Sequence, residues 1–172
     1  MTFVRRSLFF ALFAMSLLTL MGFSAPVRGQ TLGVPAVGSV FALAATNSDG
    51  VRFDAAALQG NVSVVVFWST GCAVCRDSLP ELRANLAGWR NKPFMLVLVN
   101  VDRNAADWLS YERVLGKFQA PTKGYISVRQ DDGGLLPTRL PMTLLVDTKG
   151  KILKRIEGRV APEIWDDVAD LL

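Results

Sequence analysis

The chain of 172 residues contains no histidine. This absence excludes Ser-His-Asp and Cys-His nucleophilic sites, histidine-ligated zinc or copper, and imidazole general bases. Only two cysteines are present, Cys72 and Cys75, so one chain can build neither a scaffold of several disulfides nor a four-cysteine metal site. Any chemistry must therefore use two thiols, carboxylates or amines.

The first 29 residues are typical of a targeting segment. Arg5 and Arg6 precede residues 7–27, which carry no charge and are largely apolar. A positive segment followed by an apolar one is typical of a secretory signal peptide, and 21 uncharged residues are also enough to span a bilayer. Residues 1–29 are therefore predicted to be either a cleaved signal peptide or a membrane anchor formed by residues 7–27. In both cases we expect the rest of the chain in the periplasm or another extracytoplasmic space.

The positive charge of the chain belongs mainly to this segment. The whole chain has 19 basic and 15 acidic residues, a net charge of +4. Residues 1–29 hold three arginines and no acid, which leaves 16 basic and 15 acidic residues in the remainder. A nucleic-acid-binding domain should show a clustered basic excess. We therefore expect no nucleic-acid partner.

The remaining chain is predicted to form a linker at residues 30–39 and one domain at residues 40–172. Strands are expected where apolar or alternating residues run between turn signals, at 40–43, 51–53, 62–68, 94–101, 125–128, 143–147 and 151–156. Helices are expected at 55–58, 73–89, 105–115 and 161–172, and Pro80 should kink the second of them. This order predicts an α/β fold, a three-layer sandwich with helices flanking a mixed central sheet and an N-terminal β extension.

The Cys72-Ala73-Val74-Cys75 motif follows an apolar strand directly and opens a helix. At a helix start, free backbone N–H groups and the helix dipole favour a thiolate, and such a site lowers a cysteine pKa from about 8.5 to roughly 3.5–7.5. Cys72 is therefore the predicted nucleophile. Cys75, one turn deeper, is predicted to be more buried and to resolve the mixed disulfide.

Other uses of the cysteine pair fit the sequence less well. A structural disulfide across so short a loop gains little loop-closure entropy, and zinc needs two further ligands, which would require a dimer. Haem attachment needs histidine where Arg76 stands, and a peroxide-reducing thiol is expected to follow Pro-x-x-x-Thr, where Val65 and Ser69 stand. A redox-active disulfide with no further cofactor and no metal is therefore favoured.

Residues 67–76, together with Leu79-Pro80-Glu81-Leu82, resemble the active-site segment of exported thioredoxin-like proteins of the TlpA/ResA type. Residues 140–147 and Gly158 fit the same pattern, and the resemblance covers residues 38–172. It implies a thioredoxin-like fold and a cis peptide between Leu140 and Pro141 facing the cysteines.

The resemblance also implies an activity and a set of partners. The protein would be an oxidoreductase that reduces disulfides in cysteine-containing exported proteins, with cytochrome c biogenesis as one setting, and a membrane electron donor would re-reduce it. Leu140 and Pro141 would dock an extended substrate segment. Trp68 is a further candidate substrate contact, with a core or rim position as the alternative. Two other functions stay open: a disulfide-donating oxidant, and a non-enzymatic adaptor with a structural Cys72–Cys75 disulfide.

The sequence departs from the family pattern where a proton acceptor for Cys75 is expected. Thioredoxin carries a buried acid at the position of Val66, and some relatives carry a glutamate at the position of Ser78. Asp77 and Glu81 are nearby candidates, although solvated positions on a helix face also explain them. The resemblance therefore leaves the proton acceptor unassigned.

Overall fold

The computed structural model describes residues 35–117, 123–132, 134 and 137–172. The predicted signal peptide or anchor at 1–29 and the start of the predicted linker lie outside these residues. Within them, no helix combines the length and the apolar character that crossing a membrane requires.

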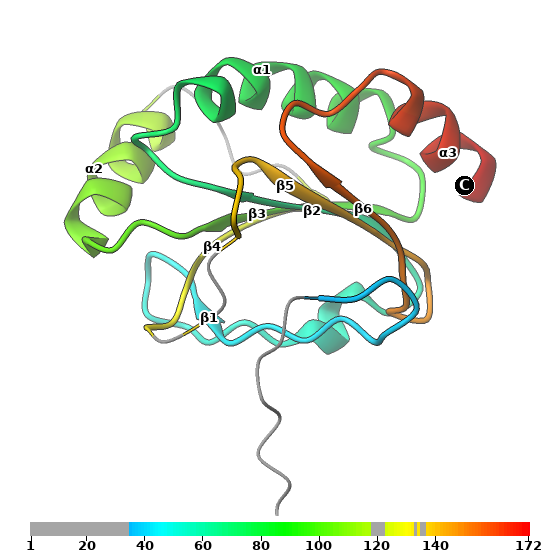
Figure 1. Ribbon diagram of the computed structural model, residues 1–172, viewed down its shortest axis with the longest axis horizontal. Coiled ribbons are helices and arrows are strands. Elements are labelled where there is room, and N and C mark those ends of the chain that lie inside the picture. Colours follow the sequence, from blue (N-terminus) through cyan, green and yellow to red (C-terminus); the bar gives the residue numbers. More distant parts are fainter. Residues whose placement is uncertain (1–34, 118–122, 133, 135–136) are drawn as a thin grey trace, which may run out of the picture. The chain divides into compact units, whose positions relative to one another are not determined.

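Six strands form one mixed sheet in the order β1-β4-β3-β2-β5-β6 (Figure 1). The strands are β1 (Ala45–Thr46), β2 (Val62–Trp68), β3 (Phe94–Asn100), β4 (Tyr125–Gln130), β5 (Met142–Val146) and β6 (Ile152–Glu157). β3 pairs in parallel with β2 and β4, whereas β5 runs antiparallel to β2 and β6, and β1 runs antiparallel to β4. All seven residues of β2 are buried, because this central strand is covered on both faces.

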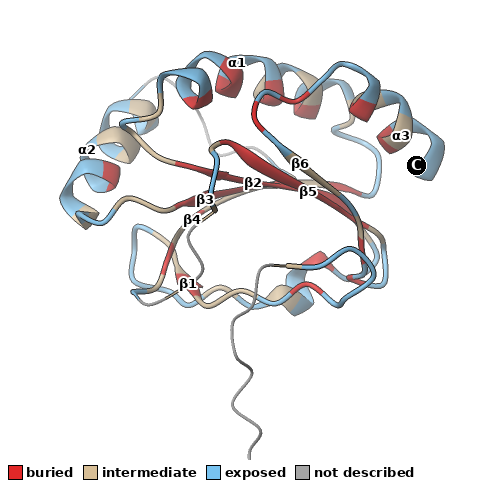
Figure 2. Ribbon diagram, in the orientation of Figure 1, coloured by how far each residue is buried: buried red, intermediate tan, exposed pale blue. Residues whose placement is uncertain are grey.

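Three α-helices cover one face of the sheet: α1 (Ala73–Gly88), α2 (Ala105–Gly116) and α3 (Glu163–Leu171). Figure 2 shows that their buried residues face the strands. The buried stripe of α1 begins at Cys75 and continues through Leu79, Leu82 and Leu86, at helical spacing. Val74, next to Cys75, is 46% exposed. It lies one residue, about 100° of rotation, away from the stripe.

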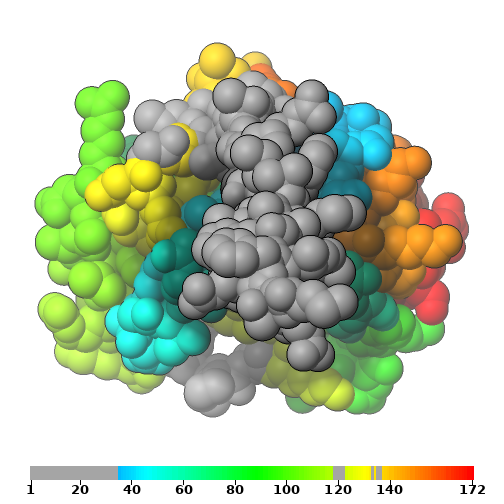
Figure 3. Space-filling model, turned by 90° about the horizontal axis from the view of Figure 1, so that it is seen from below, coloured from blue at the N-terminus to red at the C-terminus, as the bar shows by residue number. Residues whose placement is uncertain are grey.

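The opposite face of the sheet is covered by the N-terminal segment, residues 38–58, rather than by α-helices (Figure 1). Phe41 and Leu58 are buried against it, and Figure 3 shows the outer surface of this segment in blue and cyan. The segment contains one 3-10 helix, η1 (Ala55–Leu58), whose Asp54 cap accepts the Ala56 N–H at 2.8 Å. The mixed sheet and the N-terminal extension are thus as predicted, but the extension itself forms the third layer.

Within this segment the predicted strands are reduced to isolated pairs. Residues 40–43 contribute a single bridge between Val40 and Lys151, and residues 51–53 a single bridge between Thr46 and Arg52. The regular pairing falls on β1 instead. The segment crosses beneath the sheet from β6 to β4, and most of its backbone therefore runs across the strands rather than beside one.

Candidate active site

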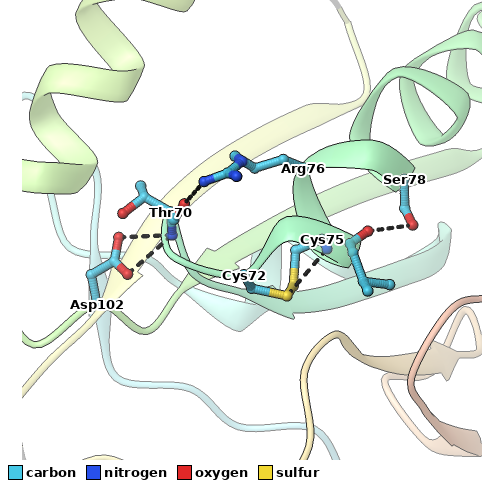
Figure 4. Close-up of a disulfide and its surroundings, with 7 residues drawn as sticks. Thr70, Cys72, Cys75, Arg76, Ser78 and Asp102 are labelled. Carbon is cyan, nitrogen blue, oxygen red and sulfur yellow. Dashed lines mark hydrogen bonds between the residues drawn. A yellow bond between two sulfur atoms is a disulfide. The ribbon is translucent and has the colours of Figure 1, made fainter.

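Cys72 and Cys75 form a disulfide at the start of α1, with their Cα atoms 5.2 Å apart (Figure 4). Cys72 is the N-cap of the helix, and its Sγ accepts the backbone N–H of Cys75 at 3.1 Å. This contact partners one of the free N–H groups at the helix start. In the reduced protein the same N–H would stabilise a Cys72 thiolate.

The two sulfur-bearing residues differ in access. Cys72 is partly exposed, whereas Cys75 retains 1% of its surface because it lies on the buried stripe of α1. Gly71 and Ala73 beside Cys72 are exposed and small. The prediction that Cys75 is the more buried cysteine is confirmed, and a bulky disulfide substrate can approach only Cys72.

The peptide bond between Leu140 and Pro141 is cis, as the resemblance implied. The antiparallel pairing of β5 with β2 sets Met142 opposite Phe67. One residue further in that register, Pro141 comes level with Trp68, where β2 ends and the turn toward the cysteines begins. The sheet pairing therefore brings the cis-proline to the cysteine-bearing end of β2.

Leu140 and Cys72 pack against the same core cluster, and both remain partly exposed. Pro141 is buried, and its carbonyl accepts the N–H of Gly158 at 2.8 Å. Of the two residues expected to dock substrate, Leu140 is thus the one with accessible surface.

Trp68 is fully buried, with 0% of its surface exposed. Its ring meets Tyr111 of α2 edge-on, with the ring centroids 4.8 Å apart. A side chain without exposed surface cannot touch a protein substrate, so the prediction that Trp68 binds substrate is corrected. Trp68 is a core residue because β2 is covered on both faces up to its last position.

The turn between β2 and Cys72 is held from two sides (Figure 4). Both carboxylate oxygens of Asp102 lie 3.1 Å from the backbone nitrogen of Thr70. The Arg76 guanidinium donates to the carbonyl oxygen of Thr70 at 2.6 Å. Sequence reasoning missed these contacts. The available signal was that Asp102 follows β3, which lies beside β2 in parallel, so that their carboxyl ends share one edge of the sheet.

Neither proposed carboxylate acceptor is buried beside Cys75. Asp77 and Glu81 are exposed on α1, and Glu81 lies 3.7 Å from Arg159. These residues therefore fit the solvated alternative. Among the described residues, no cluster of three cysteine, aspartate or glutamate side chains could hold a metal ion.

Two buried side chains with hydroxyl groups lie on α1 and on β5, the strand beside β2. Ser78, one turn further along α1, is 5% exposed and donates to the carbonyl of Val74 at 2.9 Å. Thr143 pairs with Val66 across β5 and β2 and is fully buried. Its Oγ1 has no hydrogen-bond partner among the described residues.

Three features together define a thioredoxin-like protein. They are the mixed sheet, the Cys-x-x-Cys disulfide at the start of the helix that follows the central strand, and the cis-proline at the same end of that strand. The model of the AhpC/TSA family matches residues 38–163. The chain belongs to this family.

Solved structures with the same fold include several thiol–disulfide proteins. A thiol:disulfide interchange protein from Bacteroides sp. superposes with a TM-score of 0.64 and 22% identity, over 78% of this chain and 89% of that chain. The exposed lipoprotein thioredoxin of Streptococcus pneumoniae superposes with a TM-score of 0.61 and 19% identity, over 77% of this chain and 100% of that chain. A thioredoxin-family thiol:disulfide interchange protein from Chlorobium tepidum superposes with a TM-score of 0.57 and 20% identity, over 78% of this chain and 97% of that chain. These likenesses establish the fold, and no curated protein matches the chain in sequence.

Proposed function

We propose that this protein is a thiol–disulfide oxidoreductase that reduces disulfides in exported proteins. The observation that carries the proposal is the pairing of a partly exposed Cys72 with a buried Cys75 at the start of α1. The family match and the names of the structural neighbours support the same chemistry.

In the first step, the Cys72 thiolate attacks one sulfur of a substrate disulfide. A bond forms between Cys72 and that substrate sulfur, the substrate disulfide breaks, and the other substrate sulfur leaves as a thiolate that takes a proton from solvent. The Cys75 N–H, 3.1 Å from the Cys72 sulfur in the present state, favours the attacking thiolate.

In the second step, Cys75 loses its proton and attacks the Cys72 sulfur. The Cys72–Cys75 bond forms, the mixed disulfide breaks, and the second substrate sulfur leaves and is protonated. The substrate has then gained two electrons and two protons, and the protein holds the disulfide seen here. A membrane dithiol donor would return two electrons for the next cycle.

The proposed site of action is the periplasm or another extracytoplasmic space. It rests on the arginine pair and the apolar run of residues 7–27, which lie outside the described residues. Extraction of membranes with alkali distinguishes the two arrangements: a cleaved protein is released, whereas a protein anchored by residues 7–27 stays with the lipid.

The experiment that tests the proposal traps the reaction halfway. Cys75→Ser leaves Cys72 able to attack but removes the resolving thiol, so mixed disulfides with exported proteins should accumulate and be released by dithiothreitol. Cys72→Ser is the matched control and should trap none. An absence of mixed disulfides in Cys75→Ser, together with no thiol-dependent turnover in the wild type, would favour a structural disulfide in an adaptor.

The direction of exchange follows from the reduction potential of the isolated domain. Equilibration in glutathione or dithiothreitol buffers should give a reduction potential of about −270 mV, as for thioredoxin. A value of about −120 mV is typical of a disulfide donor, and it would mean that the protein oxidises its substrates rather than reducing them.

A further inference from the structure

We propose that Asp102 is a positioning residue for Cys72 and acts, together with Arg76, through the peptide groups of Thr70. The inference rests on the proposed function, because it concerns how readily Cys72 reacts. It assigns a role to a residue 30 positions beyond Cys72 in the sequence, just past the end of β3, the strand next to β2.

The Asp102 carboxylate is itself held in place. Asn100, which is fully buried, donates its Nδ2–H to Oδ2 of Asp102 at 2.9 Å, and its Oδ1 accepts the N–H of Asp102 at 3.0 Å. From β4, Arg129 donates its Nε–H to the carbonyl oxygen of Asp102 at 3.1 Å. Side chain and backbone of Asp102 are thus both fixed, and the carboxylate is presented to Thr70 without a further loss of freedom.

The peptide groups on either side of Thr70 are held by opposite charges. The Asp102 carboxylate accepts the Thr70 N–H, and the Arg76 guanidinium donates to the Thr70 carbonyl (Figure 4). Hydrogen bonds to charged groups are roughly twice as strong as neutral ones. Both contacts act on a turn that ends at Cys72, whose N–H donates to the Ser69 carbonyl at 3.2 Å.

Holding this turn fixes the place of the reactive sulfur. Cys72 receives the Cys75 N–H only while it stays at the N-cap position of α1. If the Thr70 contacts are lost, the turn gains freedom and the sulfur spends less time at that N–H. The Cys72 thiolate is then less favoured, and its attack on a disulfide slows.

Asp102 is not a catalytic residue in this arrangement. Its two carboxylate oxygens are occupied by the Thr70 N–H and the Asn100 amide, and it acts on Cys72 through the turn alone. Its role must therefore be read from the reactivity of Cys72, not from activity alone.

The test measures alkylation of Cys72 by iodoacetamide across pH in a Cys75→Ser background, and disulfide reduction at pH 7 with both cysteines present. Asp102→Ala should slow both reactions roughly tenfold, since the Thr70 N–H loses its charged acceptor, and should move the alkylation profile to higher pH. Asp102→Asn keeps one acceptor for the Thr70 N–H and should lie between Asp102→Ala and the wild type. Arg76→Ala removes the other contact and should slow both reactions by roughly threefold.

Asp107→Ala is the matched control. Asp107 is an exposed acid in the first turn of α2, five residues beyond Asp102, and its loss should leave both measurements unchanged. If Asp102→Ala does not fold, Asp102→Asn and Arg76→Ala give the same comparison.

Wild-type rates and an unshifted alkylation profile in Asp102→Asn and Arg76→Ala would overturn the positioning role. An equal effect of Asp107→Ala would overturn it too, since removal of any nearby charge would then suffice. If the wild type reduces no disulfide while the Asp102 variants still slow alkylation, the proposed function fails and the positioning of Cys72 is upheld.

Discussion

The two faces of the sheet bury cores of different composition, and neighbouring residues of β5 point into one or the other. Leu145 packs among the α-helices, and Leu144 packs against the N-terminal segment. On the helix face, some buried polar atoms have no hydrogen-bond partner among the described residues, among them Trp68 Nε1, Trp165 Nε1 and Thr143 Oγ1. No such atom belongs to the described cluster on the other face.

The face that holds the unpartnered polar atoms is also the face that holds the disulfide. Cys75 belongs to the helix-face cluster, and each unpartnered polar atom there opposes folding by about 1–3 kcal/mol. The cluster beneath the N-terminal segment consists of aliphatic and aromatic side chains and contributes mainly by their burial. We infer that stability and thiol chemistry are largely separable between the two faces, and three substitutions test this separation.

Leu144→Ala should have the largest effect on stability. Leu144 is fully buried at the centre of the N-terminal face, and its truncation should lower the free energy of unfolding by about 2–5 kcal/mol, measured by urea denaturation. The rate of disulfide reduction by the folded fraction should stay at the wild-type value. Leu109→Ala, at a position 38% exposed on α2, is the control and should change stability by less than about 0.5 kcal/mol. Slower exchange in folded Leu144→Ala would break the separation.

Thr143→Val should have a smaller effect of the opposite sign. Valine has nearly the shape of threonine and removes a buried hydroxyl that has no partner among the described residues. The free energy of unfolding should rise by about 1 kcal/mol. Thr143→Ser, which keeps the hydroxyl and loses a methyl group, should instead destabilise. A loss of stability in Thr143→Val would mean that the hydroxyl is satisfied in the folded protein.

Glu112→Gln should give the smallest effect, visible as a pH dependence. Burial raises the pKa of Glu112 above its ordinary value of 4.5, although the Ser127 hydroxyl, which donates to it at 2.8 Å, and the charge of Arg83 oppose this shift. The folded state then holds the proton to higher pH than the unfolded state, so wild-type stability falls as pH rises from 4.5 through the folded pKa. Glu112→Gln should remove this slope. Its free energy of unfolding, measured by urea denaturation, should therefore gain on that of the wild type between pH 4 and pH 7. Parallel curves for the two proteins would contradict the prediction.

Sequence patterns predicted the central part of the fold well. β2 and α1 agree with the predicted ranges to within a residue, because a buried strand is an unbroken apolar run and Cys72 marks the helix start. Residues 40–43 and 51–53 were each assigned a strand and form isolated bridges instead. Val40 pairs with Lys151, and β1 pairs with Arg129 and Gln130; these partners are distant in the sequence, and local alternation cannot encode such pairing.

The site divides in the same way. The cysteine pair and the cis-proline belong to short motifs and were predicted. Asp102 was not, since its contact with Thr70 depends on β2 and β3 lying side by side in parallel. The sequence left Trp68 between a substrate contact and a core or rim position, because an aromatic residue beside a motif looks the same in sequence whether its ring points into the core or toward solvent.

The N-terminal segment also covers part of both edges of the sheet. β1 occupies the outer side of β4, and residues 38–41 bond to the start of β6 through Gly38, Phe41 and Ile152. An unoccupied strand edge is a template on which another chain can add a strand. Loss of residues up to 46, by truncation or proteolysis, would therefore lengthen the unpaired edge on both sides of the sheet, and copies of the protein could then join edge to edge into aggregates. The segment that completes the core thus also protects the protein from self-association.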